Sequence, residues 1–429
     1  MADTSANVPS EPVMQKTFPS AALLMSVVMA GLLPNTRAAA ESILISTNLG
    51  WTPYEQIADL VPAFEAYGTF GANVAISDDW ELVRSRLAGD PKLDYGSVEW
   101  FRGGSSNWQP AAQLALDASG STSYPLNLCS PLAIDGDLMA IGNPWVSTGW
   151  TNHQGEVDVF RRHGNAWNLE AVLIDTNATV GYEEDFGCSV AISHDTVIIG
   201  APYAVPTGGA FVATFESGAW RLSSRLPIAD PTAAFIGTSV AILDDVLVVG
   251  APGPDFGTTT IGRAYVFTKS ADRWTQRATL APPDSDGGDQ FGAAVSVGTH
   301  SIVVGAPANH TDGSIYVYSA SPSSGYALLD QLTETNRSGN VARFGFAIAQ
   351  DDDRMIVAEP GRATARLFQW NGSGWSSRSR FAADATTNHD GFGTSVAIHG
   401  RSVMIGAIGE DDGHAYIFRD DQIFNNGFE

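Results

Sequence analysis

The acidic loop PPDSDGGDQ has residue types and a spacing that suit a metal ion. Asp284, Asp286 and Asp289 place carboxylates at near-alternate positions, and oxygen ligands with such spacing can wrap a hard cation such as Ca²⁺. The connectors YEEDFG and TTNHDGFG also carry an acid just before Phe-Gly, which favours a second interpretation. In that interpretation Asp185, Asp289 and Asp390 hold a turn through side-chain to backbone hydrogen bonds. Ca²⁺ is the only cofactor that the sequence suggests.

The motifs of common catalytic sites are missing from the chain. There is no HExxH, GxSxG or CxxC, and the eight histidines are scattered. The carboxylates stand mostly in turns, where Asp is favoured for local hydrogen bonding. We therefore expect a protein that is not an enzyme. The alternative is an enzyme acting on polysaccharide, with acidic loop residues as general acid and base.

Candidate ligand-binding residues gather in three long loops, WVSTGWTNHQ, DTNATVGYEED and GPDFGTTTIG. Their aromatic rings offer stacking area and their polar groups offer hydrogen bonds, as interfaces commonly do. The alternative is that these side chains pack on neighbouring loops. The candidates are Trp145, Trp150, His153, Tyr182, Asp255 and Phe256.

These loops join the strands of a unit that occurs seven times in the sequence. Each unit starts with an alternating apolar run, usually after Phe-Gly, as in FGCSVAISHD and FGAAVSVGTH. A second run ends in a corner such as IGAP or VGAP, where Gly and Ala allow close backbone approach and Pro ends the ladder. A third run, such as GRAYVF, alternates with period two. Recurrence at about fifty residues indicates a solenoid or a propeller.

A fourth strand in each unit starts with a large aromatic residue. We expect these rings to fill the widening gap between neighbouring units at the outer rim. The seventh ring comes from GWTPYEQIADL near the N-terminus, because the chain ends soon after its last third strand. The set is Trp51, Trp108, Trp167, Trp220, Trp274, Tyr326 and Trp375.

Splitting one unit between the two ends of the chain favours a closed ring over an open stack. An open stack would need capping repeats, whereas a ring closes when the N-terminal strand pairs with the last unit. The sequence thus predicts an all-β fold, a seven-bladed β-propeller of four-stranded antiparallel blades. One of its faces carries the connections from second to third and from fourth to first strands. We call it the long-loop face, and it is the expected binding surface.

The Phe-Gly pairs at 186 and 291, followed by Gly-Ala-Pro at 200 and 305, resemble the FG-GAP repeat family. The resemblance extends over nearly the whole chain after residue 40. It implies a propeller like that of the integrin alpha N-terminus, of the bacterial exported type, with a role in adhesion or extracellular ligand binding. Integrin-like units often carry a calcium loop between the first and second strands. Here these hairpins are short, as in SHDT and LDDV, so those sites are not transferred.

The N-terminus has the form of a secretory signal peptide, expected over residues 1–40 with Met14 as a second candidate start. Lys16 precedes an apolar run of thirteen residues, which is short of the roughly 20 that span a bilayer. The propeller is expected over 41–421, followed by a tail at 422–429. Cys129 and Cys188 could pair after export, since inner strands of adjacent blades approach, or be two buried small hydrophobes.

Charge narrows the range of partners. The chain has 47 acidic and 23 basic residues and a net charge of −24, which disfavours nucleic acid and anionic membranes. We expect an exported module, extracellular, periplasmic or on the cell surface, that presents loops to a protein or glycan. A purely structural surface component is a further alternative. An enzyme would differ in having several carboxylates converge in one pocket near the ring axis.

Overall fold

The computed structural model describes seventeen ranges of the chain. They are 54–61, 69–78, 80–85, 97–102, 109–115, 129, 131–146, 154–164, 166–178, 184–253, 261–271, 273–283, 287–309, 312–334, 341–382, 391–409 and 413–420. The chain divides into Met1–Ala39 and Ala40–Glu429, and every described residue belongs to the second unit. The expected signal peptide and C-terminal tail lie outside the described residues.

Seven four-stranded antiparallel sheets make up the described fold. Blade 1 contains β2 (Asn73–Ser77), β3 (Trp80–Ser85), β4 (Ser97–Arg102) and β5 (Gln109–Ala115). Blade 2 contains β6 (Leu132–Asp135), β7 (Leu138–Asn143), β8 (Glu156–His163) and β9 (Ala166–Leu173). Blade 3 contains β10 (Ser189–Ser193), β11 (Thr196–Ala201), β12 (Gly209–Glu216) and β13 (Ala219–Leu222). Blade 4 contains β14 (Ser239–Leu243), β15 (Val246–Ala251), β16 (Arg263–Ser270) and β17 (Arg273–Leu280).

The remaining three blades follow the same pattern. Blade 5 contains β18 (Ala294–Val297), β19 (Ser301–Ala306), β20 (Ser314–Ser319) and β21 (Leu328–Thr333). Blade 6 contains β22 (Ile348–Asp351), β23 (Arg354–Glu359), β24 (Thr364–Trp370) and β25 (Trp375–Ala382). Blade 7 contains β26 (Phe392–His399), β27 (Ser402–Ala407), β28 (His414–Arg419) and, from the N-terminal part of the chain, β1 (Glu55–Leu60). Two short 3₁₀ turns, η2 (Pro322–Ser324) and η3 (Pro360–Arg362), complete the described elements.

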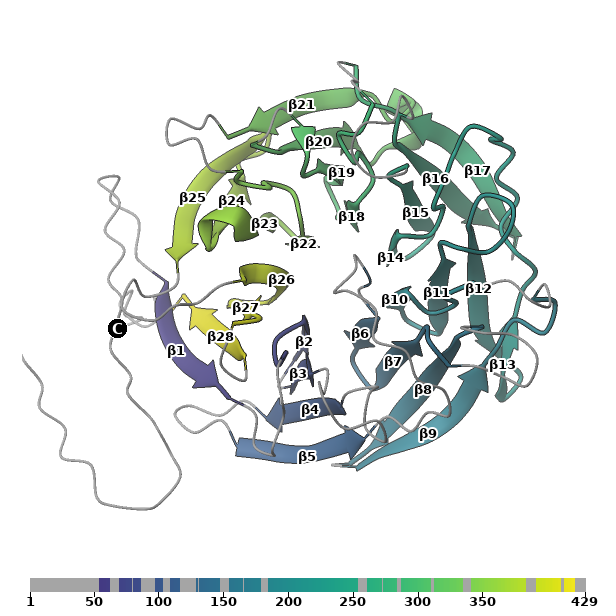
Figure 1. Ribbon diagram of the computed structural model, residues 1–429, viewed down its shortest axis with the longest axis horizontal. Coiled ribbons are helices and arrows are strands. Elements are labelled where there is room, and N and C mark those ends of the chain that lie inside the picture. The colour runs from purple at the N-terminus through teal and green to yellow at the C-terminus, as the bar shows by residue number, and fades with distance from the viewer. Residues whose placement is uncertain are drawn as a thin grey trace, which may run out of the picture. The chain divides into compact units, whose positions relative to one another are not determined.

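The blades form a closed ring around an axis (Figure 1). The first strand of each blade contacts the first strands of both neighbouring blades, in the order β2, β6, β10, β14, β18, β22, β26 and back to β2. Seven apolar clusters occupy the seven interfaces between adjacent blades. The core is therefore distributed around the ring, and each blade depends on both of its neighbours.

Pairing of β1 with β28 closes the ring, and β1 lies beside β28 in Figure 1. The ladder runs from Glu55 opposite Arg419 to Leu60 opposite Ala415, with a bulge after Gln56. This pairing confirms the fold predicted from the split repeat. A strand from the start of the chain thus completes the blade formed at its end.

The Phe-Gly and Gly-Ala-Pro residues meet at the interfaces between blades. Gly187 has a φ of 91°, in the left-handed region that favours glycine. Any Cβ on Gly142 of blade 2 would overlap the Gly187 carbonyl oxygen of blade 3. Phe186, next to Gly187, is fully buried in the core between blades 2 and 3. The same contact joins Gly406 of blade 7 to Gly71 of blade 1. The repeated sequence is therefore the docking contact of one blade on the next.

A side-chain hydrogen bond from the second residue after Phe-Gly secures several of these contacts. Ser189, Ser239 and Ser395 each donate from Oγ to the carbonyl oxygen of the glycine at the Phe-Gly position of the next blade, which is Ile-Gly in blade 4, at 2.8, 2.8 and 2.9 Å. The bond from Ser395 reaches Gly71 and spans the closure of the ring. In blade 1, Asn73 donates from Nδ2 to the equivalent carbonyl oxygen, that of Cys129, at 3.2 Å.

Blade 2 has Pro131 at this serine position, and Pro131 has no hydroxyl to donate. There a disulfide joins Cys129 of blade 2 to Cys188 of blade 3. The covalent bond thus connects the same two segments that a serine hydrogen bond connects elsewhere. The pairing interpretation of the two cysteines is the one that the structure supports.

Replacing both cysteines by serine should lower the free energy of unfolding by about 2–4 kcal/mol, because the bridge constrains the unfolded chain between positions 59 residues apart. Urea denaturation of the wild type and of the double variant measures the difference. Wild-type protein treated with reductant should unfold like the variant. Identical midpoints for oxidised wild type and variant would contradict this assignment.

The aromatic residues of the fourth strands lie between their own blade and the preceding one. Trp220 packs on the cluster between blades 2 and 3, and its Nε1 donates to Glu170 Oε2 at 2.9 Å. Trp375 belongs to the cluster between blades 5 and 6 and donates to Ser301 Oγ at 3.1 Å. The structure places Trp167, Trp274 and Tyr326 at the corresponding interfaces. Trp51 and Trp108 lie outside the described residues.

Candidate functional site

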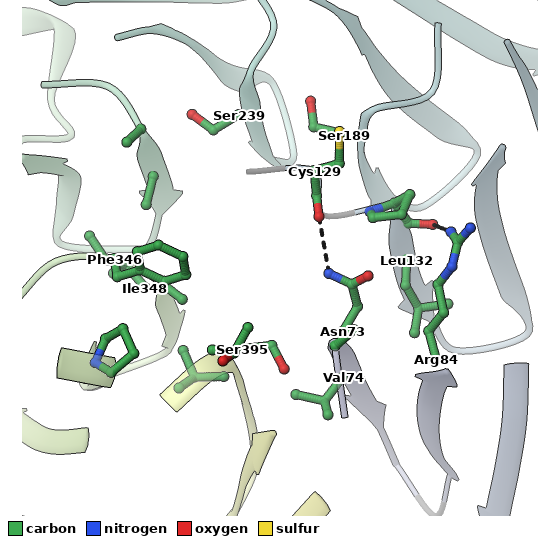
Figure 2. A pocket seen from close by; sticks show the side chains of 18 of the residues that line it. Asn73, Val74, Arg84, Cys129, Leu132, Ser189, Ser239, Phe346, Ile348 and Ser395 are labelled. Atoms are coloured by element: carbon green, nitrogen blue, oxygen red, sulfur yellow. Dashed lines mark hydrogen bonds between the residues drawn. The ribbon is translucent and has the colours of Figure 1, made fainter. Parts of the chain in front are cut away.

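A pocket of about 530 Å³ lies on the axis of the ring (Figure 2). Its wall comes from the first half of the inner strands and from corners that follow second strands, at Trp145, Pro360 and Ile408. Because both kinds of segment belong to the long-loop face, the pocket lies at that face of the propeller. All seven blades contribute to the wall.

Trp145 is the one ligand candidate of the sequence analysis that the described residues include. It follows Pro144 at the end of the second strand of blade 2, lines the pocket and packs in part against the cluster between blades 1 and 2. The structure therefore places it both at the pocket and against neighbouring side chains. The other candidates, Trp150, His153, Tyr182, Asp255 and Phe256, lie outside the described residues.

The polar groups of the pocket are largely those that connect the blades. The hydroxyls of Ser189, Ser239 and Ser395 give their hydrogens to glycine carbonyls, so their lone pairs remain free to accept from a ligand. Figure 2 shows Asn73 reaching Cys129 on one side of the pocket, with the ring of Phe346 across from them. The wall thus consists largely of small residues, is tied together by hydrogen bonds between blades, and offers several hydrogen-bond acceptors to a ligand.

The charged residues among those lining the pocket are both arginines, Arg84 and Arg343. Arg84 is buried and donates from Nη1 to the carbonyl oxygen of Gly142 at 2.7 Å. Arg343 is exposed and immediately precedes Phe344 at the entry to the inner segment of blade 6. No carboxylate belongs to the described wall of the pocket, although the protein as a whole is strongly acidic.

The calcium hypothesis rests mainly on residues outside the described part of the chain, namely Asp284 and Asp286. Asp289 lies within it, and its Oδ2 accepts a hydrogen bond from Asn309 Nδ2 at 3.0 Å. That partner is a side chain, whereas the turn interpretation expected the backbone. Across the described residues no group of three or more His, Cys, Asp or Glu is arranged to hold a metal. Calcium binding stays a prediction.

A pair of half-buried carboxylates on β8, Glu156 and Asp158, lies beside Asn143 of β7. Asn143 Nδ2 donates to Asp158 Oδ2 at 3.2 Å. Burial, followed by repulsion from Glu156, raises the pKa of Asp158 to about 6, and the hydrogen bond from Asn143 opposes the rise only in part. Since the pKa is raised, the native protein holds this proton more tightly than the unfolded chain does. The contribution of Asp158 to the free energy of unfolding is therefore fully present below about pH 4, and it is lost as the pH rises through 6.

The variant Asp158→Asn should therefore be more stable than the wild type at pH 7, by about 1–3 kcal/mol, because it keeps a neutral group in this place. The two proteins should have nearly equal stability at pH 4. Thermal melting at both pH values measures the change, and Asp245→Asn, at an exposed turn, is the control. A variant that is less stable at pH 7 would contradict the account.

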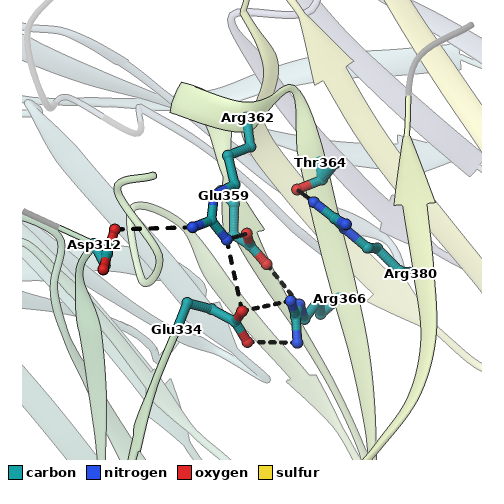
Figure 3. Close-up of polar contacts among 7 residues, drawn as sticks. All are labelled: Asp312, Glu334, Glu359, Arg362, Thr364, Arg366 and Arg380. Carbon is teal, nitrogen blue, oxygen red and sulfur yellow. Dashed lines mark hydrogen bonds and ion pairs between the residues drawn. The ribbon is translucent and has the colours of Figure 1, made fainter. Parts of the chain in front are cut away.

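An ionic cluster joins blades 5 and 6 near the long-loop face (Figure 3). Glu359 takes the alanine position of Gly-Ala-Pro, and its side chain is fully buried. Arg366 donates from Nε to Glu359 Oε1 at 2.7 Å and from Nη2 to Glu334 Oε2 at 2.5 Å. Arg362 Nη1 lies 3.5 Å from Glu359 Oε2, and Arg362 Nη2 lies 3.8 Å from Asp312 Oδ1. Burial raises the pKa of Glu334, which the neighbouring arginines partly offset. The cluster connects blades 5 and 6 through ion pairs, whereas the glycine contacts between the other blades carry no charge.

Sequence reasoning did not single out the serines, Asn73, Arg84 or Arg343 as site residues. One signal was available for some of them, since Asn73, Ser189, Ser239 and Ser395 occupy the same position of the repeat. In a propeller equivalent positions of the inner strands surround the axis, so a repeated polar residue there points toward the pocket. Arg84 and Arg343 have no counterparts in the other units and gave no such signal.

The fold and the axial pocket define the class of the protein, a seven-bladed β-propeller. Its sequence matches the family model of the FG-GAP repeat over residues 167–213, 232–267, 274–318 and 375–418. The chain thus carries FG-GAP repeats in four places, and its seven-bladed fold is consistent with an FG-GAP propeller like that of integrin alpha subunits. Three of the matched segments begin at Trp167, Trp274 and Trp375, so the family model starts its repeat at the fourth strand, as this chain does.

Among solved structures the chain resembles the crystal structure of the WD40 domain of Toxoplasma gondii coronin. The TM-score is 0.51 at 10% sequence identity, and the alignment covers 85% of this chain and 86% of that one. A likeness at this identity concerns the fold alone. No curated protein matches the sequence. In the described part of the chain, no helix has the length and apolar character needed to cross a membrane.

Proposed function

We propose that the protein is an exported binding module that presents its long-loop face to a protein or glycan ligand, without catalysing a reaction. The axial pocket carries this proposal. It is concave, its wall is held by backbone contacts and hydrogen bonds between blades, and Trp145 stands at its edge. Rigid walls reduce the entropy lost on binding, and an aromatic residue at a pocket is a frequent anchor of binding energy.

Export is supported by three independent features. The N-terminal residues have the pattern of a signal peptide. The disulfide between blades 2 and 3 is of the kind that persists in oxidising compartments. FG-GAP repeats are common in extracellular proteins, and the chain carries them at four places.

The composition of the pocket favours binding over hydrolysis. Glycoside hydrolysis needs two carboxyl groups about 5–9 Å apart across the scissile bond. The described residues around this pocket supply arginines and hydroxyl groups instead. An FG-GAP propeller is also typically a non-enzymatic module.

A glycan array and a pull-down from cell-surface extracts, both with the full chain, test the proposal. Trp145→Ala should weaken the binding of whatever partner is found by at least roughly tenfold, as truncation of an anchor residue does. The matched control is Trp274→Ala, since Trp274 packs between blades 3 and 4 away from the pocket. Equal binding by Trp145→Ala and wild type, or cleavage of the captured glycan, would contradict the proposal.

A further inference from the structure

We propose that the axial pocket binds the terminal residue of a carboxylated glycan, a uronic or sialic acid, with Arg343 pairing with its carboxylate. The inference rests on the proposed function and adds the chemical class of the ligand. It starts from the charge of the pocket. In a chain with a net charge of −24, the charged residues of the described pocket wall are arginines alone.

Arg343 is the cation available to a ligand. It is exposed, it lines the pocket, and among the described residues its guanidinium has no hydrogen-bond or ion-pair partner. Its backbone is fixed, because the next residue, Phe344, is 1% exposed and the Phe346 N–H donates to the Arg343 carbonyl at 3.2 Å. A planar guanidinium on a fixed backbone is suited to a bidentate contact with a carboxylate.

The serine hydroxyls favour a ligand that brings hydroxyl groups of its own. Ser189, Ser239 and Ser395 already donate to backbone carbonyls, so toward the pocket they act as acceptors. They come from three different blades around the axis. Sugar hydroxyls can donate to several such acceptors at once, whereas an aliphatic acidic side chain cannot.

The size and walls of the pocket fit the end of a chain. A cavity of about 530 Å³ falls in the usual range for small-ligand sites and has room for one or two sugar rings. Trp145 and Phe346 are the aromatic residues of its wall and offer faces on which a ring can stack. Because all seven blades surround the pocket, a glycan enters with its terminus, and the rest of the glycan extends from the long-loop face.

The overall charge of the protein points to a ligand with an isolated carboxylate. A polyanion would be repelled by the net charge of −24, while one carboxylate beside Arg343 interacts mainly with the local field. We therefore expect discrimination between a terminal acidic sugar and a densely charged polymer.

The experiment is a ligand-observed NMR titration of the full protein with methyl glucuronide and N-acetylneuraminic acid. The methyl ester of each sugar is the uncharged match, and a short glutamyl peptide is the competing source of a carboxylate. At least one of the two acids should bind, and its methyl ester should bind roughly 10- to 100-fold more weakly, as expected on losing a charge-assisted pair. Arg343→Gln should reduce the affinity for the acid by the same factor and leave the affinity for the ester unchanged. The control Arg273→Gln alters an exposed arginine on β17 and should change neither affinity.

Several results would overturn the inference. They are equal binding of acid and ester, equal binding of the acid by Arg343→Gln and wild type, tighter binding of the glutamyl peptide than of either sugar, or binding of neither sugar acid. Equal melting temperatures of the variants and wild type show that a loss of binding is local. If a partner is captured through Trp145 but Arg343→Gln has no effect, the inference fails and the proposed function stands. If no partner binds the long-loop face at all, the proposed function itself fails.

Discussion

A chain that begins at Val61, and so lacks β1, should not form a stable propeller. Tyr54 and Leu60 are each 4% exposed, and burying side chains of this kind contributes about 1.5–3 kcal/mol each. The loss of the β1 ladder also leaves β28 as an open edge, which invites aggregation. Since folded domains are stable by only about 5–15 kcal/mol, the deletion removes a large fraction of the total. Size-exclusion chromatography and urea denaturation measure the outcome.

The control for this deletion is a chain that begins at Ala40. It lacks residues 1–39, none of which belongs to the described part of the chain, and it keeps β1. It should elute as a folded species with the denaturation midpoint of the full chain. A chain from Val61 that unfolds cooperatively at the same midpoint would show that β1 is dispensable.

Replacing Arg366 by methionine should destabilise the protein by about 3–5 kcal/mol, the usual result of leaving a buried charge without its partner. The side chain of Glu359 is fully buried, and Arg366 is its nearest cation at 2.7 Å. In the variant Glu359 keeps, among the described residues, the cation of Arg362 at 3.5 Å, and Glu334 loses both of its contacts with Arg366. Urea denaturation at pH 7 measures the effect.

A second substitution separates a lost charge pair from lost packing. Adding Glu359→Ala to Arg366→Met introduces the alanine that blades 3, 4, 5 and 7 have at this position, and it should recover at least half of the lost stability. Arg273→Met on the exposed face of β17 should change the stability by less than about 0.5 kcal/mol. If the double variant is less stable than Arg366→Met alone, the cluster is not held together by its charges.

The architecture could be predicted because the same strand pattern occurs in all seven units of the sequence. Seven similar units define the blade, and the aromatic fourth strand near Trp51 reveals that one unit is split. Ring closure follows, since only a closed ring gives the N-terminal strand a partner in the last blade. The contact between Gly142 and Gly187 explains why the motif recurs. A glycine is needed in each blade because the backbone of the neighbouring blade approaches it too closely for a Cβ.

The pocket and its charges could not be predicted, because they depend on residues that depart from the repeat. Arg84 takes the place of the Gly in Gly-Ala-Pro, Glu359 takes the place of its Ala, and Arg343 stands in a position of variable residue type. In the sequence each of these residues is a single departure from the repeat, with nothing to indicate a role. Only the three-dimensional structure shows that Arg343 lines the axial pocket and that Glu359 pairs with Arg366, the third residue of β24.

The disulfide illustrates an intermediate case. The sequence allowed both pairing and burial of Cys129 and Cys188, and distance in the ring decides between them. The alignment of units contained a further clue, since Pro131 stands where blade 3 has Ser189. At this interface a disulfide stands where three other interfaces have a serine hydrogen bond.

The closed ring is the claim on which the pocket, the long-loop face and the ligand all depend, and cross-linking tests it most directly. Glu55 and Arg419 are paired residues of β1 and β28, and opposite residues of antiparallel strands lie within the Cα distance that a disulfide spans. The double variant Glu55→Cys with Arg419→Cys should oxidise to a cross-link that peptide mapping by mass spectrometry detects. Glu55→Cys with Ser402→Cys should not, because Ser402 pairs with Arg419 from the other side and lies about two strand spacings from Glu55. Free thiols at 55 and 419 under oxidising conditions, in a folded protein, would contradict the closed ring.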